Sequence, residues 1–474
     1  MVLVAGVDSS TQSVKVVVCD ADTGAIVREA RGSHPDGTEV DPRRWWEELS
    51  RVLGGEGSEG FLTGVSAMSI AGQQLGMVAL DADGIPVRNA LLWNDTRAAP
   101  DAADLIFELG GPEAWAAAVG SVPPAGFTVS KVRWLARVEP ENAARVHRLM
   151  HPHDYLTWRL AGCPDDVVTD RGDASGSGYW SPAQSCYRMD IFTRALGRAA
   201  ELPRVAGPAE RIGTARGTDI ALGPGTGDNM AAGLALDLRP GDVVVSLGTS
   251  GTAYAVSEHP TADASGRVVG LADARGRFLP LVCTLNAARV LTATAALLGM
   301  SLDELGEAAL SAAPGSEGLV LLPYLDGERT PALPFATGSL HGIRRDNLTP
   351  ANVARAAIEG MLCGLADAVD ALSEVGVTIR RVLLIGGAAV NPAVPSIAAT
   401  LMPASVVVPP AFEFVAIGAA RQAAWVHRGG ADPPVWSGYQ GRDVHATLVP
   451  AVRENYASVR DRAYPELADP MGKV

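Results

Sequence analysis

A polar turn near the start of the chain carries residue types that could bind a phosphate and its metal ion. Asp8 ends an apolar run from Val2, Ser9, Ser10 and Thr11 follow it, and Lys15 comes four residues later. A carboxylate at such a turn can hold Mg²⁺ directly or through water, while hydroxyls and free backbone N–H groups bind phosphate oxygens. Alone, the pattern favours an ordinary β-hairpin, because strands commonly end in Asp-Ser turns.

The second half of the chain repeats this plan. DVVVSLGTSGTAYAVSE, from Asp242, is a β-branched run, a tight turn from Ser246 to Gly251, and a second β-rich run. Gly248 and Gly251 let the backbone approach a ligand, and the turn hydroxyls and amides could bind phosphate. The repeat predicts two similarly built halves whose hairpins face a common cleft and hold one polyphosphate.

A third turn of small residues ends another apolar strand. RVLLIGGAAVN, from Arg381, closes on Gly386 and Gly387, and such glycines would admit the face of an adenine or a ribose. Together with the two hairpins, this turn predicts a site for one nucleotide.

Asp228 is the candidate catalytic base. It lies in the glycine-rich segment GTGDNMAAG, near the point where the composition shifts and a domain boundary is expected. Phosphoryl transfer needs a clamped γ-phosphate, a metal ion and a carboxylate that accepts the proton of the attacking hydroxyl. The alternative role is structural, because aspartate is also a common N-cap and NMAAGLAL could form a helix behind it.

The intervening segments alternate between strand and helix signals. A helix is expected after Asp41 and Pro42, another after Thr349 and Pro350, and a third in VAIGAARQAAW after the strand from Arg381. The fold class is therefore α/β, with predicted domains at 1–223 and 224–474.

Composition narrows the classes of function. The chain has 474 residues, 47% hydrophobic, and a net charge of −14 without a block of basic residues, which disfavours nucleic acid as a partner. No basic leader precedes the first apolar run, and Asn286 and Arg289 interrupt the apolar segment from Leu281, so we expect a buried or amphipathic helix there rather than a membrane span. These features predict a cytoplasmic protein without a membrane partner.

Cysteine and histidine usage does not indicate a metal centre. The five cysteines are scattered and lack a CxxC pair, which predicts reduced thiols. His151 and His153 in HPHDY raise a metal site, but neither a cysteine nor a third histidine lies nearby in sequence, so a loop before a helix is the favoured interpretation.

Several of these segments, with others spread along nearly the whole chain, resemble the FGGY family of carbohydrate kinases and, within it, the xylulose kinases. GVDSSTQSVKVVV and SLGTSG resemble the two phosphate hairpins, SIAGQQLG the sugar-binding turn, and GTGDN the catalytic segment. LLWNDTR, GFTVSKVRWL, LPYLDGERTP, GSLHGIRRDNLTPANVARAAIEG and LIGGAAVNP also match family segments. The resemblance implies a two-domain, actin-like (ribonuclease H-like) ATPase fold with a cleft between duplicated domains, and transfer of phosphate from ATP to D-xylulose with Mg²⁺, giving D-xylulose 5-phosphate and ADP.

The resemblance also assigns roles to individual residues. It makes Asp228 the general base and Asp8 the carboxylate at the metal ion. The expected sugar-binding residues are Gln74, Leu75, Trp93, Asp228 and Asn229. The expected ATP-binding residues are Thr11, Gln12 and Lys15 in the first hairpin, Gly248, Thr249 and Ser250 in the second, and Gly386, Gly387 and Asn391 at the adenosine motif. The resemblance allows a homodimer.

One position departs from the family pattern. The sugar-binding turn of xylulose kinases usually places a histidine before its glycine, whereas this chain has Leu75 before Gly76. The missing imidazole would remove a hydrogen bond to the sugar, worth about 1–3 kcal/mol, and so retune substrate preference. The alternatives that stay open are a kinase for another ketose or a polyol, a non-catalytic sugar or nucleotide sensor on the same fold, and an actin-like or chaperone-type ATPase.

Overall fold

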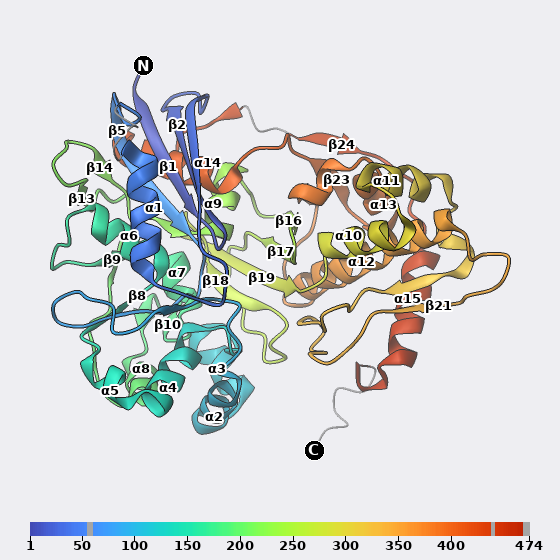
Figure 1. Cartoon of the computed structure of the whole chain (residues 1–474), viewed down its shortest axis with the longest axis horizontal. Helices are drawn as coiled ribbons and strands as arrows, with labels where there is room; N and C mark the ends of the chain where they lie inside the picture. The colour runs from blue at the N-terminus through green and yellow to red at the C-terminus, as the bar shows by residue number, and fades with distance from the viewer. Residues whose placement is uncertain (55–59, 438–440, 468–474) are drawn as a thin grey trace. The chain divides into compact units, whose positions relative to one another are not determined.

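The computed structural model describes residues 1–54, 60–437 and 441–467 (Figure 1). It divides into two compact units, each built from several segments. Unit 1 comprises Met1–Leu238, Val256–Pro280 and Phe412–Tyr439, and unit 2 comprises Arg239–Ala255, Leu281–Ala411 and Gln440–Val474. The domain boundary expected at 223/224 stays a prediction.

Unit 1 is built on a mixed sheet. Strands β1 (Leu3–Ser9), β2 (Ser13–Asp20) and β3 (Ile26–Ser33) form an antiparallel meander in which Asp8 lies opposite Lys15. β5 (Val65–Gly72) pairs with β1 in parallel, and β14 (Ala221–Leu222) pairs with β5 in parallel. β1 and β5 are almost wholly buried because both faces of the sheet are covered. The expected first hairpin and meander are confirmed.

Unit 2 repeats the same order of pairings. Strands β16 (Asp242–Leu247), β17 (Gly251–Ala255) and β19 (Phe278–Thr284) pair antiparallel, and β22 (Arg381–Ile385) and β23 (Ser405–Val408) continue from β16 in parallel. β24 (Arg442–Val444) adds an antiparallel edge. The internal repeat predicted from the two hairpins is thus confirmed at the level of strand topology.

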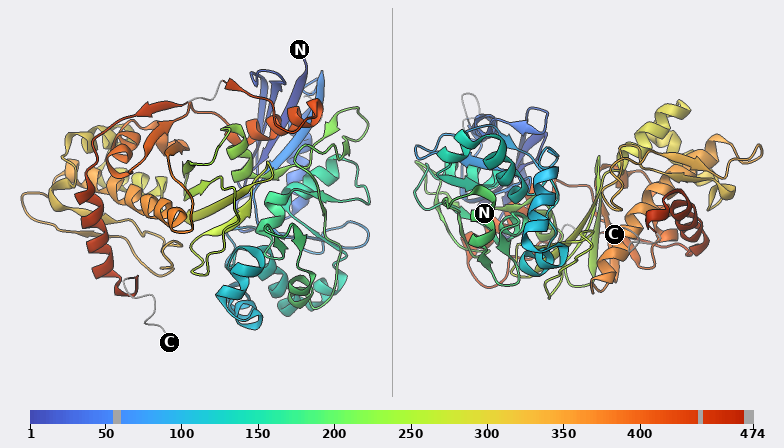
Figure 2. Two further views of the ribbon diagram at one scale, coloured as in Figure 1. Left: turned by 180° about the vertical axis from the view of Figure 1, so that it is seen from behind. Right: turned by 90° about the horizontal axis from the view of Figure 1, so that it is seen from below.

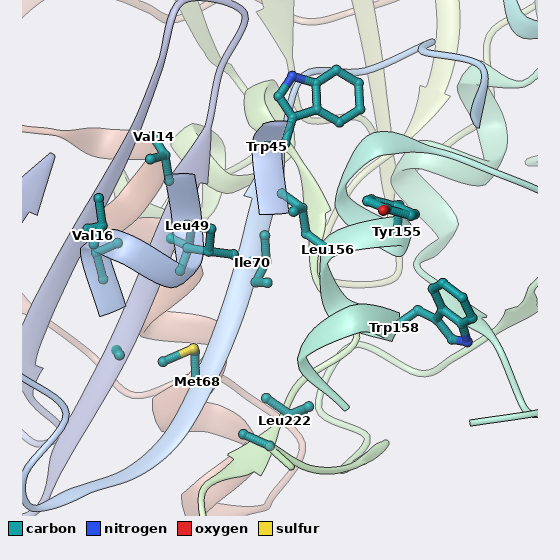
Figure 3. Packing of buried hydrophobic residues seen from close by; sticks show 14 of the residues in the cluster. Val14, Val16, Trp45, Leu49, Met68, Ile70, Tyr155, Leu156, Trp158 and Leu222 are labelled. Atoms are coloured by element: carbon teal, nitrogen blue, oxygen red, sulfur yellow. The ribbon is translucent and has the colours of Figure 1, made fainter. Parts of the chain in front are cut away.

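A large hydrophobic cluster lies between the sheet of unit 1 and the helices on one of its faces, which we call the outer face (Figure 3). Trp45 and Leu49 of α1 (Pro42–Gly54) are fully buried in it with Met68 and Ile70 of β5. Tyr155 and Leu156 of α6 (Pro152–Leu160) complete the packing. The helix predicted after Asp41 is confirmed, and its buried positions lie three and four residues apart, as an amphipathic helix requires.

The inner face of this sheet is covered by a helix from late in the chain. Helix α14 (Phe414–Arg428) packs on β1, β5 and α9 (Asp228–Ala235), and both views place it beside the blue strands (Figures 1 and 2). A Cβ at Gly6 of β1 would collide with the α14 backbone at Ala416 and Ala420, and one at Gly418 would collide with Ala231 of α9. Because of these glycines, the strand that carries Asp8 and the helix that begins with Asp228 both pack closely against α14.

Smaller elements complete unit 1. Its other helices are α2 (Ala99–Leu109), α3 (Pro112–Val119), α4 (Thr128–Val138), α5 (Pro140–Arg145), α7 (Arg171–Gly176) and α8 (Met189–Leu196). Its short strands are β4 (Glu39–Val40), β6 (Val78–Leu80), β7 (Ala90–Leu91), β8 (Arg148–Met150), β9 (Val168–Thr169), β10 (Trp180–Ser181), β11 (Cys186–Tyr187), β12 (Arg204–Val205), β13 (Gly213–Thr214), β15 (Thr226–Gly227) and β18 (Val269–Ala272).

Helix α12 (Pro350–Glu374) is the long buried helix of unit 2. The Thr349 side chain accepts a hydrogen bond from the Asn352 N–H at 3.2 Å, and Pro350 takes the first helical position, so the predicted helix start is confirmed. The unit also contains α11 (Leu302–Ser311), α13 (Ala393–Leu401), α15 (Pro450–Ala463), β20 (Val320–Leu322) and β21 (Ser339–His341).

The prediction of one continuous helix from Leu281 is wrong. Leu281 to Thr284 belong to β19, and α10 spans only Ala288–Leu298. Asn286 breaks the continuity, because its side-chain amide donates to the Gly327 carbonyl at 2.7 Å. Of the helices in the described ranges, none is long and apolar enough to cross a membrane.

Candidate active site

The first hairpin places a buried carboxylate beside a lysine. Asp8 is 3% exposed, accepts a hydrogen bond from the Ser10 hydroxyl at 2.5 Å, and lies 3.8 Å from the Lys15 ammonium. The turn between β1 and β2 contains Ser10, Thr11 and Gln12, and a backbone bond from Ser10 N–H to Ser13 O at 3.0 Å closes it. Gln12 is exposed in this turn.

The expected sugar turn follows directly after β5. Gln73 and Gln74 are buried, and the Gln73 N–H donates to Ser9 O at 3.0 Å, which ties this turn to the end of β1. The Trp93 indole N–H donates to the Thr11 hydroxyl at 2.9 Å, and that hydroxyl in turn donates to Gln73 at 3.3 Å. The residues expected at the sugar and those expected at the phosphate are therefore joined within unit 1.

Asp228 begins helix α9 but does not cap it. The N-cap residue is Gly227, and the Asp228 carboxylate accepts hydrogen bonds only from its neighbour Asn229, at 2.7 Å from the backbone N–H and 2.8 Å from the side-chain amide. The same amide donates to Gln74 at 3.1 Å. The structural alternative for Asp228 as an N-cap is wrong, and three of the five expected sugar-binding residues, Gln74, Asp228 and Asn229, are linked by hydrogen bonds.

Two like charges share this site. Burial, opposed by Ser10 and Lys15, raises the pKa of Asp8 to about 6. Burial and then the charge of Asp8 raise the pKa of Asp228 to about 7. A carboxyl group with a pKa near neutrality can take a proton during the reaction and release it afterwards, which is the property of a general base.

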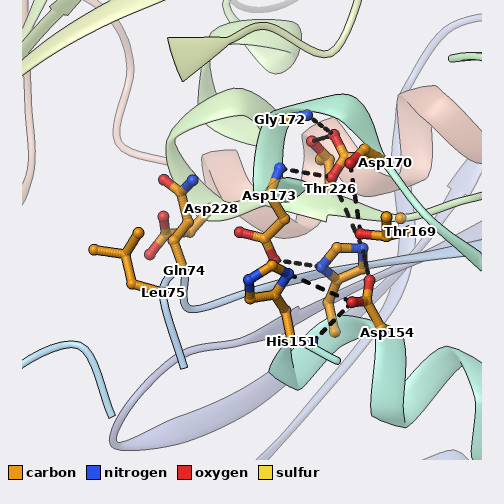
Figure 4. A network of polar contacts seen from close by, with 12 residues as sticks. Gln74, Leu75, His151, Asp154, Thr169, Asp170, Gly172, Asp173, Thr226 and Asp228 are labelled. Carbon is orange, nitrogen blue, oxygen red and sulfur yellow. Dashed lines mark hydrogen bonds and ion pairs between the residues drawn. The ribbon is translucent and has the colours of Figure 1, made fainter. Parts of the chain in front are cut away.

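A buried cluster of charges lies behind the sugar turn, beside Gln74, Leu75 and Asp228 (Figure 4). The His153 imidazole contacts Asp173 at 2.6 Å and Asp154 at 3.1 Å, and its Nε2 lies 3.9 Å from Asp170. Burial alone would lower the pKa of His153, but these carboxylates raise it to about 10, so the ring is a cation at neutral pH. Asp170 accepts a hydrogen bond from Thr226 at 2.8 Å, two residues before Asp228. The cluster therefore fixes the strand that leads into the candidate base.

Sequence reasoning missed this cluster. The favoured interpretation of HPHDY, a loop before a helix, is wrong in its bounds, because only His151 precedes α6, as its N-cap, and Pro152 to Tyr155 form the first turn of the helix. No group of three or more metal-binding side chains that could hold an ion exists among the residues described. The signals that could have located the cluster are the acidic neighbour Asp154 directly after His153 and the Asp170–Asp173 spacing typical of a helix N-terminus.

In unit 2 the second hairpin and the glycine turn are in direct contact. Gly248, Thr249 and Ser250 connect β16 to β17, and Thr249 is exposed. Gly386 has a φ of +94°, and a Cβ there would lie 2.7 Å from the Leu247 carbonyl. Gly387 begins a short 3₁₀ turn and has open space beside it. The structure thus brings the expected phosphate and adenosine residues of this unit together.

The Asn391 side chain forms hydrogen bonds within unit 2. Its side-chain amide donates to Leu302 O at 2.7 Å, and its side-chain oxygen accepts from the Ala393 N–H at 3.0 Å. These bonds fix the start of α13. The expected contact between Asn391 and adenosine stays a prediction. The Asn391 side chain would have to make that contact while keeping its hydrogen bonds at the start of α13.

Comparison with known proteins decides the family. Models of the N-terminal and C-terminal domains of the FGGY family of carbohydrate kinases match residues 3–227 and 243–427. The chain belongs to the FGGY family. As an FGGY kinase it is an ATP:sugar phosphotransferase with the actin-like, ribonuclease H-like fold expected from its sequence.

Individual relatives of this FGGY kinase cover most of its length. It is 47% identical to a xylulose kinase of Streptomyces coelicolor over 89% of this chain and 87% of that protein. It is 31% identical to a xylulose kinase of Escherichia coli over 81% of each chain. The crystal structure of a xylulose kinase from Bifidobacterium adolescentis matches with a TM-score of 0.89 and 42% identity, over 97% of this chain and 99% of that one.

Proposed function

We propose that this FGGY kinase phosphorylates D-xylulose, producing D-xylulose 5-phosphate and ADP from ATP. The observation that carries the proposal is the carboxylate of Asp228, which does not cap helix α9 and whose pKa is raised to about 7. Asn229 links this carboxylate to the sugar turn at Gln74. We choose D-xylulose as the substrate because the chain matches xylulose kinases over most of its length.

In this proposal the protein acts mainly by positioning and by moving one proton. Asp228 accepts the proton of the sugar hydroxyl, the hydroxyl oxygen forms a bond to the γ-phosphorus, and the bond from that phosphorus to the bridging oxygen of ADP breaks. Asn229 and Gln74 orient the carboxylate and the sugar, while Leu75 and Trp93 line the pocket. ATP is bound by Thr11, Gln12 and Lys15 in unit 1 and by Gly248, Thr249, Ser250, Gly386, Gly387 and Asn391 in unit 2.

The residues around Asp8 fit a magnesium ion. Asp8 and Asp228 place two carboxylates close enough for one to raise the pKa of the other, and Lys15 is the one cation that contacts Asp8 in the described residues. A divalent cation would relieve this repulsion, and oxygen ligands are those Mg²⁺ prefers. Mg²⁺ held by Asp8 would neutralise charge on the transferring phosphate.

Leu75 favours a second candidate substrate. With leucine in place of the histidine usual in xylulose kinases, the turn lacks one polar partner for a sugar hydroxyl, so another ketose such as ribulose could be preferred. We expect the enzyme to act in the cytoplasm, and the family allows a homodimer.

The deciding experiment compares ATP-dependent phosphorylation of D-xylulose, D-ribulose, L-ribulose, L-xylulose and glycerol. Asp228→Asn is the test variant, and Asp83→Asn, an exposed carboxylate in a distant turn, is the matched control. We expect the highest kcat/KM for D-xylulose, loss of turnover in Asp228→Asn with ATP binding retained, and normal turnover in Asp83→Asn. A higher kcat/KM for another sugar would reassign the substrate. Ligand binding without turnover would indicate a sensor, and sugar-independent ATP hydrolysis would indicate an actin-like ATPase.

A further inference from the structure

Leu75 holds an uncommon backbone conformation in the middle of the sugar turn. Its φ is +65°, in the left-handed region that branched side chains rarely occupy. Such a residue persists only where its surroundings hold it there, and these residues gather at functional sites. The contacts that hold Leu75 therefore determine how the turn meets its ligand.

Two side chains of helix α4 bind the Leu75 carbonyl. The Lys131 ammonium donates to this oxygen at 2.8 Å and to the Gly126 carbonyl at 2.6 Å. The Thr128 hydroxyl donates to the same Leu75 oxygen at 3.1 Å. One carbonyl of the turn thus receives two hydrogen bonds from a single helix, one of them from a charged donor.

Lys131 is an unusual residue to find in this place. Its side chain is fully buried, although a buried ammonium is unfavourable unless it is well bonded. Among 39 basic residues the chain contains only three lysines, at positions 15, 131 and 473. A lysine offers a compact charge with three donors that can converge on carbonyl oxygens, a geometry that the planar guanidinium of arginine does not match.

The turn has no room to move away from these donors. A Cβ at Gly176 would lie 2.7 Å from the Leu75 side chain, one at Gly227 would lie 2.6 Å from the Gln74 amide carbon, and one at Gly76 would lie 2.5 Å from the Pro152 ring. Residues Gln74 and Leu75 are enclosed by backbone on these sides. The two donors hold the Leu75 carbonyl and so oppose rotation of its peptide.

We infer that Lys131, assisted by Thr128, is a positioning residue for sugar binding, holding the Leu75 carbonyl so that the left-handed turn presents Gln74 and Leu75 to the substrate. The inference rests on the proposed function for the identity of the sugar. The arrangement of the turn itself does not depend on that identity, so the two can be tested separately.

The test is Lys131→Met, with Arg133→Met as the matched control. Arg133 lies on the same helix but bonds to Arg194 O and Glu108, away from the turn. Loss of a charged donor typically weakens binding about tenfold or more, so Lys131→Met should raise the KM for D-xylulose by about that factor. The KM for ATP should change by less than about twofold, since the carbonyls that Lys131 binds belong to Leu75 and Gly126, neither of which is an expected nucleotide residue. Arg133→Met should leave both unchanged.

A rescue variant separates positioning from general support of the fold. Glycine adopts positive φ without strain, so Leu75→Gly in the Lys131→Met background gives up the Leu75 side chain but should keep Gln74 in place and recover part of the lost sugar affinity. If Lys131 only supports the fold, Leu75→Gly will not help, the KM values for sugar and ATP will change together, and the inference is overturned. Should Lys131→Met not fold, Thr128→Val removes the second donor and should raise the sugar KM by about threefold under the same reasoning.

Amide hydrogen exchange gives a readout that needs no sugar. The Gln73 N–H bonds to Ser9 O and the Met77 N–H bonds to Leu91 O at either end of the turn. Exchange across residues 71–77 should accelerate in Lys131→Met and not in Arg133→Met. Unchanged exchange would overturn the inference. Accelerated exchange in an enzyme that does not phosphorylate D-xylulose would refute the proposed substrate and leave the role of Lys131 standing.

Discussion

Lys15 and Glu413 form an ion pair at 2.6 Å across 398 residues of sequence. Glu413 immediately precedes α14 and also binds Arg31 at 3.0 Å. The lysine expected at the ATP phosphates is therefore bound to a carboxylate. Binding of ATP must either replace this carboxylate or proceed beside it.

Replacing Glu413 should strengthen ATP binding. Glu413→Gln removes a negative charge near the expected phosphate site and leaves Lys15 free to bind phosphate. Because partly exposed ion pairs contribute about 0.2–1 kcal/mol, the KM for ATP should fall by up to about fivefold. Steady-state kinetics with varied ATP checks this, and Arg31→Met, which removes the other partner of Glu413, should not lower that KM. A higher KM for ATP in Glu413→Gln would contradict the idea that Lys15 leaves Glu413 to bind the phosphates of ATP.

Activity should depend on a group that titrates near neutrality. Asp228 must be ionised to accept a proton, and its pKa is raised to about 7 by burial and by Asp8. We therefore expect kcat/KM to rise with pH through about 7 and to level off above it. Asp8→Asn removes the nearby negative charge, so the residual kcat/KM of this variant should rise at a lower pH than that of the wild type. A profile that is flat from pH 5 to 8 would rule out Asp228 as the titrating base.

The same carboxylate should destabilise the protein above its pKa. The folded-state pKa of Asp228 is raised above the unfolded value, so its contribution to stability is favourable at low pH and is lost as pH rises through about 7. Asp228→Asn should therefore have a higher Tm than the wild type at pH 8 and little advantage at pH 5, while turnover falls by about 10²–10⁴-fold. Thermal unfolding at both pH values measures the difference. An equal change in Tm at the two pH values would show that ionisation is not its source.

Removal of the buried cation should unfold unit 1 readily. His153→Gln leaves Asp154, Asp170 and Asp173 without their shared partner, and loss of one member of a buried ion pair costs about 3–5 kcal/mol. Because the pKa of His153 is raised to about 10, its stabilisation is complete below pH 6.5 and is lost as pH rises toward 10. Denaturant unfolding should show the largest loss at pH 6. Asp173→Asn added to His153→Gln should restore part of the stability, and no restoration would mean that packing rather than charge dominates.

Leu75→His should restore the polar partner that is usual in xylulose kinases. Histidine tolerates positive φ better than leucine does, so the turn should keep its shape. A regained hydrogen bond of about 1 kcal/mol would lower the KM for D-xylulose roughly fivefold. Leu75→Met, apolar and of similar volume, is the control and should not lower it. A lower KM for a different sugar would instead assign that sugar as the natural substrate.

The sequence allowed the two hairpins, the glycine turn after β22 and the cap at Thr349 to be predicted, because each is encoded by neighbouring residues. Asp228 could be selected as the base for the same reason. The contacts that set its environment could not be predicted, since Thr226 reaches Asp170 across 56 residues and Lys131 reaches Leu75 across another 56. The segment from Leu281 was mistaken for a helix because a short apolar run has no decisive period.

The packing of α14 on the first sheet has a consequence for synthesis on the ribosome. β1 and β5 are complete after 72 residues, but the helix that covers their inner face begins only at Phe414. A nascent chain thus carries an uncovered apolar sheet through most of its translation, and such surfaces recruit chaperones or aggregate. Phosphoryl transfer therefore requires that α14 has packed on β1 and β5, so we expect a chain that stops before Phe414 to be inactive.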